Sequence, residues 1–484
     1  MVFVHKYPLL AGTLAVLLSA ALLLMGNGLD SVWPVMWVAL IPVLLFAAET
    51  SSSLAAGSSA MLAMLLGSLP MLRYLHFILK LPVTAWLVPF SIASFLFAIG
   101  VLLFRALLRR CSVFNAAIAL PAFWSLCEYG ASFVPASGTA GSLSYTQLRF
   151  LPILQVASIT GPWGITFLLL LFPATIVTAI HLRDRSSRRV TLAIGSLFAV
   201  LAAAIMFGMF RLRVQQPHET IKVGLVDTDS VVFAEGHAAM QDLLGRYAAE
   251  AETVARQGAK IVVMPEKTGL LLDRDASSFD PILQSVADKT GGTLVIGVLH
   301  AAGRDSFNEA RIYAPNSPVT TYDKQHMLPP FESNLTPGRS LTMLHDQPAL
   351  VGVAICKDMD FVHPALDYGR AGIGLLLDPA WDFQVDRAWH GHIAIMRGVE
   401  GGYAIAHAAK DGYLTVTNNR GQVLGEVRTD SSAFASLLVD VPLIHNTTLF
   451  DRLGTWFPWL TAVLLLGAVF RLIRPGPADI NSPS

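Results

Sequence analysis

Three polar residues that follow predicted strands could together perform nucleophilic catalysis. Glu266 follows KIVVMP, Lys324 follows VTTYD and Cys356 follows VGVAI. An apolar run that ends in a polar turn is typical of a buried strand, and catalytic groups gather where such strands open into loops. A thiol nucleophile needs a base to take its proton and a cation or donors to hold the oxyanion that it creates. Glutamate, lysine and cysteine supply those three roles.

A purely structural interpretation competes with this one. Free cysteine is among the most buried residue types, and a single glutamate or lysine is usually only a solvated charge. Whether Cys356 is a core residue or a nucleophile therefore depends on the compartment in which it lies.

The composition indicates a membrane protein. Of the 484 residues, 54% are hydrophobic and 14% are charged, and the formal net charge is zero. The chain is too apolar for an ordinary soluble protein, and its zero net charge argues against a nucleic-acid partner. Between the apolar parts, a segment from about residue 215 to 445 has the charge density of a globular domain.

Eight apolar stretches are predicted to span a membrane, on the basis that a span needs about twenty residues. They are Pro8–Met25, Trp33–Ala48, Leu54–Leu69, Ala85–Phe104, Ala116–Phe133, Trp163–Leu182, Val190–Phe210 and Thr455–Phe470. Lys and Arg precede the first span and follow the fourth, sixth and eighth. The positive-inside rule places these sites in the cytoplasm, so the charged segment faces outward. We therefore expect about seven transmembrane helices in residues 1–214, an exported domain at 215–447, a last helix at 448–473 and a disordered tail at 474–484.

The predicted exported location favours a reactive role for Cys356. An exported compartment is oxidising, and thiols there usually pair. Cys111 and Cys127 lie in or beside predicted spans, where we interpret them as small apolar residues. Cys356 is the only cysteine of the exported segment, so it is a candidate reactive thiol.

The exported segment alternates strands and helices. Apolar residues at three- and four-residue spacing predict a helix over 240–255, and a second is expected over 386–399. Strands are predicted at Ile221–Asp227, Lys260–Glu266, 293–299, 309–315, 319–324, 351–356, Ile373–Asp378, 403–408, 413–418 and 434–440.

The order Glu266, Lys324, Cys356, with these flanks, resembles the nitrilase (carbon–nitrogen hydrolase) superfamily. The membrane arrangement resembles one branch of it, the apolipoprotein N-acyltransferases. MPEKTG resembles the branch's motif around the base, and KQHMLPPFE resembles a segment that maps a supporting glutamate onto Glu332. GPWGITFLLLL and DPAWDF resemble two further motifs, and the second contains Trp381 and Phe383.

The resemblance implies a fold and a reaction. The fold is a multi-span α-helical membrane protein with an inserted, exported α/β nitrilase-like domain, which is an αββα sandwich. Glu266 would deprotonate Cys356, and Lys324 would stabilise the oxyanion formed on a phospholipid ester. The thioester would then acylate the N-terminal amine of a diacylglyceryl-lipoprotein. The resemblance further implies an inner-membrane location with the catalytic domain in the periplasm and no cofactor, and we expect a monomer.

Several residues depart from the family pattern or leave alternatives open. Lys357 and Asp358 stand where the family has tyrosine and glutamate. Lys357 could favour the thiolate and attract an anionic headgroup, or simply pair with Asp358. Trp381 and Phe383 could line a lipid pocket or only pack. Histidines such as His390 and His392 match no zinc motif, so no metal is expected.

Three classes of function remain open from the sequence. The first is the lipid-to-amine acyltransferase, which includes a catalytically altered relative with a different acyl acceptor. The second is a membrane-anchored amidase or nitrilase in which water resolves the thioester. The third is a silent relative that keeps the fold for binding, against which the intact triad argues.

Overall fold

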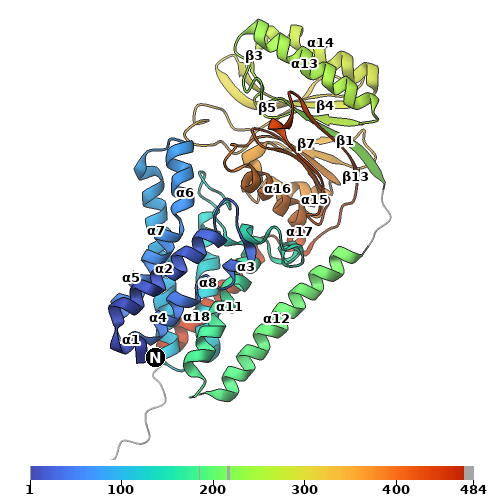
Figure 1. Cartoon of the computed structure of the whole chain (residues 1–484). Helices are drawn as coiled ribbons and strands as arrows, with labels where there is room; N and C mark the ends of the chain where they lie inside the picture. Colours follow the sequence, from blue (N-terminus) through green and yellow to red (C-terminus); the bar gives the residue numbers. More distant parts are fainter. Residues whose placement is uncertain (1, 185, 215–218, 474–484) are drawn as a thin grey trace, which may run out of the picture.

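A computed structural model describes residues 2–184, 186–214 and 219–473, which form a helical part and an α/β part (Figure 1). Helices precede the first strand and follow the last one. The predicted tail at 474–484 lies outside the described residues.

Long apolar helices dominate the N-terminal part. By length and composition, five helices of the described chain could cross a membrane, or six if a pair bent by 48° counts as one span. The five are α2 (Pro8–Gly26), α7 (Val83–Arg109), α11 (Pro162–Leu182), α12 (Ser187–Arg213) and α18 (Trp456–Ile473), and the bent pair joins α5 (Ser53–Gly67) to Leu69–Ile78.

The number differs from the eight predicted spans for two physical reasons. The predicted second span is broken into α3 (Trp33–Met36) and α4 (Ile41–Glu49), which are four and nine residues long. The predicted fifth span corresponds to α8 (Val113–Ala131), where Asn115 and Glu128 lower the mean hydropathy of a helix that is otherwise long enough. The remaining short helices are α1 (Val2–Lys6), α6 (Leu69–Arg73), η1 (Tyr74–Ile78), η2 (Leu143–Gln147), α9 (Leu151–Leu154) and α10 (Ala157–Thr160).

The α/β part contains two sheets. The first has the strand order β13-β1-β2-β4-β5-β6, with β3 paired to β4. Its strands are β1 (Thr220–Asp227), β2 (Ile261–Val263), β3 (Leu270–Leu272), β4 (Thr293–Ala302), β5 (Asp305–Tyr313), β6 (Thr320–Asp323) and β13 (Ala435–Pro442). The second has the order β12-β11-β10-β9-β8-β7. Its strands are β7 (Thr342–Leu344), β8 (Val351–Val353), β9 (Leu375–Trp381), β10 (Ala404–Lys410), β11 (Tyr413–Thr417) and β12 (Val423–Arg428).

The two sheets pack face to face between layers of helices. One apolar core joins Val223 and Val263 of the first sheet to Val353 and Leu377 of the second. The helices α13 (His237–Arg256) and α14 (Asp273–Thr290) cover the outer face of the first sheet, and α15 (Ala365–Ala371) and α16 (Arg387–Gly401) cover that of the second (Figure 1). This αββα sandwich beside a bundle of apolar helices confirms the predicted fold class.

The sandwich rests on loops of the helical part. Thr139, in the loop after α8, donates from its backbone N–H and its hydroxyl to the carbonyl of Asp360, at 2.8 and 2.7 Å. Arg397 of α16 donates to the hydroxyls of Thr139 and Tyr145, at 3.1 and 2.7 Å. After the sandwich, α17 (Leu449–Leu453) leads into α18, where Trp456 donates to the carbonyl of Ile159 at 2.7 Å. These contacts hold α16 and the segment at Asp360 against the helical part.

Candidate active site

The three predicted residues lie at the ends of strands β2, β6 and β8. Glu266 follows β2 by three residues, Lys324 follows β6 directly, and Cys356 begins η3 (Cys356–Asp360) three residues after β8. Cys356 has a φ of +45°, in the left-handed region that non-glycine residues seldom adopt. The chain therefore makes a strained turn at the cysteine, which is a common feature of functional sites.

Lys324 is held between two buried carboxylates. Its ammonium donates to Glu266 Oε1 at 2.8 Å and to Glu332 Oε2 at 3.0 Å. The three side chains are only 1–2% exposed. Asn308 of β5 donates to Glu266 at 2.5 Å and to Glu332 at 2.8 Å, so it joins the two carboxylates. A buried charge is tolerated only when it is paired and hydrogen-bonded, and this cluster meets that condition.

Lys267 adds a second cation to the cluster. Its ammonium lies 2.6 Å from Glu332 Oε1 and 3.8 Å from Glu266 Oε1. Burial alone would raise the pKa of Glu266, but the ammonium groups of Lys324 and Lys267 outweigh it and hold that pKa below its usual value. The same two cations, against the effect of burial, lower the pKa of Glu332 to about 2. Two carboxylates thus face two ammonium groups, and Glu266 is ionised at neutral pH.

The Cys356 thiol lies within the field of this cluster. Burial raises its pKa well above the usual value, the Glu266 carboxylate raises it further, and the Lys324 ammonium opposes both. The backbone N–H of Cys356 donates to Asp378 Oδ1 at 2.7 Å, and its sulfur lies 3.8 Å from the carbonyl oxygen of Trp381. The thiol is therefore protonated at rest, so a base must remove its proton before it can attack.

Asp358 ties the cysteine turn to the segment that carries Lys324. One carboxylate oxygen accepts from the backbone N–H groups of Gln325 and His326, at 3.1 and 2.8 Å. The other accepts from the Tyr322 hydroxyl at 2.8 Å and from the Ile355 N–H at 3.1 Å. With both oxygens bonded, Asp358 holds the cysteine turn and the segment after β6 in a fixed relation.

Lys357 pairs with a different partner from the one considered in the sequence. Its ammonium lies 3.0 Å from Asp360 Oδ2 and donates to the carbonyl of Ala136 at 2.9 Å. The suggested pairing with Asp358 is therefore wrong. The physical reason is that η3 carries Lys357 toward the loop after α8, while Asp358 faces the opposite segment.

Trp381 and Phe383 lie on two sides of the site. The ammonium of Lys410 lies 3.9 Å from the centroid of the Trp381 ring, and that of Lys267 lies 5.3 Å from it. The Phe383 ring meets Tyr74 of η1 edge-on, with centroids 6.4 Å apart. Trp381 thus packs against the cations of the site, whereas Phe383 contacts the helical part.

Lys410 is buried at the end of β10. Its ammonium donates to the carbonyls of Val232 and Lys267, at 2.6 and 2.7 Å. Burial lowers its pKa to about 7. Lys410 therefore holds the backbone at Lys267, whose φ of +45° is also in the left-handed region.

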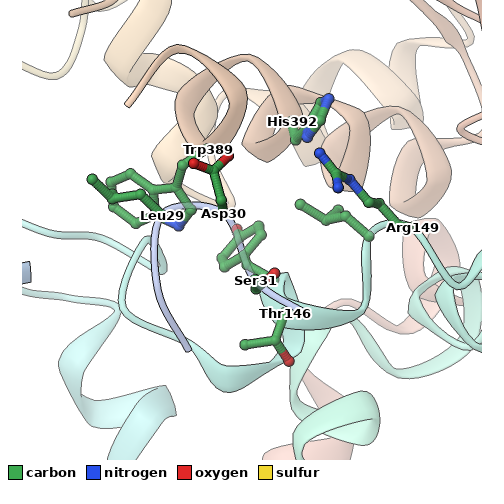
Figure 2. Close-up of a pocket in the computed structure, with 9 residues that line it drawn as sticks. Leu29, Asp30, Ser31, Thr146, Arg149, Trp389 and His392 are labelled. Carbon is green, nitrogen blue, oxygen red and sulfur yellow. The ribbon is translucent and has the colours of Figure 1, made fainter. Parts of the chain in front are cut away.

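The two histidines considered for a metal site have separate carboxylate partners. His390 lies 2.5 Å from Asp386 Oδ2, and His392 lies 3.7 Å from Glu426 Oε2. His392 also lines a hollow with Asp30, Arg149 and other residues, where the loop before α3 and the segment around η2 meet α16 (Figure 2). This hollow lies where the helical part contacts the α/β part, and Cys356 does not line it.

Sequence reasoning missed several residues around the cysteine. Asn308 and Lys267 contact Glu332 from 24 and 65 residues away, so no local spacing reveals them. His407 lies between Asp378 and Asp382, at 2.7 and 3.4 Å from their Oδ2 atoms. The one available signal was a histidine in the middle of the apolar run AIAHAA, at a position that strand periodicity buries.

The sandwich, with a cysteine beside a buried Glu–Lys–Glu cluster, defines a nitrilase-type domain built into a helical membrane protein. Residues 11–175 match the family model described as the apolipoprotein N-acyltransferase N-terminal domain. An apolipoprotein N-acyltransferase of Geobacter metallireducens is 26% identical over 71% of this chain and 71% of its own length. That of Haemophilus ducreyi is 24% identical over 80% of this chain and 82% of its own.

The chain is therefore similar to the apolipoprotein N-acyltransferases, and its long apolar helices indicate a multi-pass membrane protein. This confirms the resemblance predicted from its motifs. Among solved structures, an amidase from Nesterenkonia sp. is 20% identical and covers 50% of this chain and 97% of its own, with a TM-score of 0.42.

Proposed function

We propose that this protein moves a fatty acyl chain from a membrane phospholipid, through a thioester on Cys356, to the N-terminal amine of a lipoprotein. The observation that carries the proposal is the buried Lys324 between Glu266 and Glu332, beside a protonated thiol. The names of the relatives support the acyltransferase class and the lipoprotein acceptor.

The first half-reaction forms the thioester. Ionised Glu266 takes the Cys356 proton, and the sulfur attacks the ester carbonyl carbon. Lys324 and nearby backbone N–H groups stabilise the oxyanion, and loss of one such donor typically costs about 10²–10³ in rate. The C–O bond then breaks, and Glu266 returns its proton to the departing alcohol.

The second half-reaction releases the acyl chain. An amine attacks the thioester, the C–N bond forms and the C–S bond breaks, and Glu266 passes one N–H proton to the leaving sulfur. In this scheme Glu332 keeps Lys324 in place and Asp358 fixes the cysteine turn, while Lys357 anchors that turn to the helical part. Trp381 and Phe383 form the proposed sides of the substrate site.

The proposed arrangement in the membrane brings the enzyme to substrates that carry acyl chains. Residues 1–214 and 448–473 would hold the enzyme in the inner membrane, with residues 215–447 in the periplasm. Both substrates are confined to the bilayer by their acyl chains, so a membrane-held monomer meets them by lateral diffusion.

The test is an acyl-transfer assay with purified protein in detergent micelles. The donor is a phospholipid with an isotope-labelled acyl chain, and the acceptor is a diacylglyceryl-cysteine peptide. We expect labelled N-acyl peptide with the wild type and with Cys127→Ser, a control in α8. Cys356→Ser and Glu266→Gln should form none. Labelled free fatty acid without N-acyl peptide would contradict transfer and indicate hydrolysis by water.

A further inference from the structure

A polar hollow on the Asp378 side of Cys356 has no role in the chemistry described so far. Its polar lining comes from Cys356, Asp360, Asp378, Asp382, His390 and His407. Glu266 and Lys324 are not among the residues that line it. Cys356 therefore lies between two polar groups of residues: the Glu266–Lys324 cluster, which has a proposed role, and this hollow, which has none.

A buried hydrogen-bonded chain runs from the cysteine backbone to Asp382. Asp378 accepts from the Cys356 N–H with one oxygen and contacts His407 Nδ1 with the other, each at 2.7 Å. Nε2 of the same ring lies 3.4 Å from Asp382 Oδ2. Burial would lower the pKa of His407, but the two carboxylates raise it to about 10, so the ring is an imidazolium at neutral pH.

The charges around the hollow leave an excess of one negative charge. Asp378 and Asp382 share the His407 cation. The other two carboxylates have one cation each, since Asp360 pairs with Lys357 and Asp386 with His390. Burial would lower the pKa of His390, but Asp386 raises it to about 9, so this ring is also charged. Four carboxylates thus face three cations.

Among the carboxylates that line the hollow, Asp382 has a buried oxygen without a donor. The Asp382 side chain is 1% exposed, yet within the described residues its Oδ1 atom accepts no hydrogen bond. A buried carboxylate oxygen without a donor is costly, so the site is suited to a ligand that supplies an N–H. An N-terminal amine has a pKa of about 7.7–8.0 and so arrives largely as an ammonium ion, which is both a donor and a cation.

We propose that this hollow binds the ammonium group of the acyl acceptor, with Asp382 Oδ1 accepting one of its N–H bonds. The inference rests on the proposed function and names the acceptor subsite within it. Asp382 then takes one proton from the ammonium, and the neutral nitrogen attacks the thioester carbonyl carbon. As the C–N bond forms and the C–S bond breaks, Glu266 passes the second N–H proton to the leaving sulfur.

The test compares a charged and a neutral nucleophile on the same acyl-enzyme. The full-length protein is first acylated with phospholipid, and loss of the thioester is then followed by intact mass. The nucleophiles are a diacylglyceryl-cysteine peptide and hydroxylamine, which is uncharged at neutral pH. Asp382→Asn removes the carboxylate at nearly constant volume, and Asp367→Asn removes an exposed carboxylate of α15 as a control.

We expect Asp382→Asn to slow transfer to the peptide about 10–100-fold more than it changes acylation, the range for a lost hydrogen bond to a charged group. Release by hydroxylamine should change no more than acylation does. The peptide defect should shrink as the pH rises through the amine pKa, because the free amine needs no carboxylate. Asp382→Ser, made in parallel with a smaller side chain, should show the same pattern.

Two results would overturn the proposal. Unchanged transfer to the peptide would show that Asp382 does not bind the amine. Equal slowing of acylation and of thioester cleavage by both nucleophiles would mean that Asp382 positions Cys356. Failure of the proposed function looks different, since the wild type itself would then form no acyl-enzyme.

Discussion

Lys267 shows how a single charge can set the strength of the proposed base. It stands directly after Glu266 and shares Glu332 with Lys324, so the base works beside two cations. A cation close to a carboxylate favours the ionised form. The base is therefore ready at neutral pH, although it binds a proton less tightly than an isolated buried glutamate would.

Replacing Lys267 with methionine should change the pH dependence of acylation. Loss of the cation destabilises the Glu266 carboxylate, so its pKa rises. Because the base must be ionised, the acid limb of the pH profile of kcat/KM should move to higher pH. The rate of thioester formation measured between pH 4 and 8 checks this, with the exposed Lys260→Met as a control. An unmoved limb, or one at lower pH, would disprove the role of Lys267.

At the scale of elements, strands that lie within longer apolar runs were predictable, including the three-residue strands β2 and β8, and strands outside such runs were not. The runs at 293–299 and 413–418 predicted β4 and β11, and the helices at 240–255 and 386–399 correspond to α13 and α16. Strands β3 and β7 have three residues each, and β12 is mostly exposed, so they lack a clear pattern.

The residues of the candidate site also differ in how far the sequence could predict them. Glu266, Lys324 and Cys356 could be proposed because each one ends a predicted strand, and Glu332 was proposed from a motif. The partner of Lys357 and the contacts of Asp382 depend on how η3 and β10 meet distant segments, which spacing along the chain does not encode.

Gly138 lies where the cysteine turn docks on the loop after α8, and this docking can be tested. Gly138 has a φ of +52°, and a Cβ atom there would lie 2.6 Å from the carbonyl oxygen of Asp360. Gly138→Ala should therefore destabilise the protein by roughly 1–3 kcal/mol, the range for such backbone strain, and slow acylation. Thermal melting in detergent and the acylation rate measure both effects.

Gly130→Ala is the matched control, because a Cβ atom at that position in α8 meets no atom within 4 Å. It should melt at or above the wild-type temperature, since alanine favours a helix over glycine. Equal melting temperatures and rates for both variants would mean that the turn does not depend on this contact.

For the whole molecule, the number of spans decides which side of the membrane the sandwich occupies. Four of the candidate helices precede β1, and the bent pair makes five. An odd number before the sandwich puts it on the side opposite the N-terminus, and α18 then returns the chain. The prediction of seven preceding spans gives the same outcome. It adds two crossings, the α3–α4 segment and α8, and two more crossings leave the sandwich on the same side.

We therefore predict that reporter fusions at Asp305 and after α18 give opposite readouts, with Asp305 in the periplasm. The arginines after α7 and α11 lie on the side of the N-terminus when the α3–α4 segment and α8 also cross, and the positive-inside rule makes that side cytoplasmic. Matching readouts at the two sites would mean that α18 does not cross the membrane, and a cytoplasmic readout at Asp305 would mean that an even number of spans precedes the sandwich.

The central claim is that Cys356 carries the acyl chain of a membrane phospholipid, and intact-mass analysis of the purified full-length protein tests it most directly. After incubation with phospholipid of a single acyl composition, the wild type should gain the mass of one acyl group, and hydroxylamine should remove it. Cys356→Ser should gain none. A wild-type mass that stays unchanged under conditions that acylate a relative, or an equal gain on Cys356→Ser, would contradict the account.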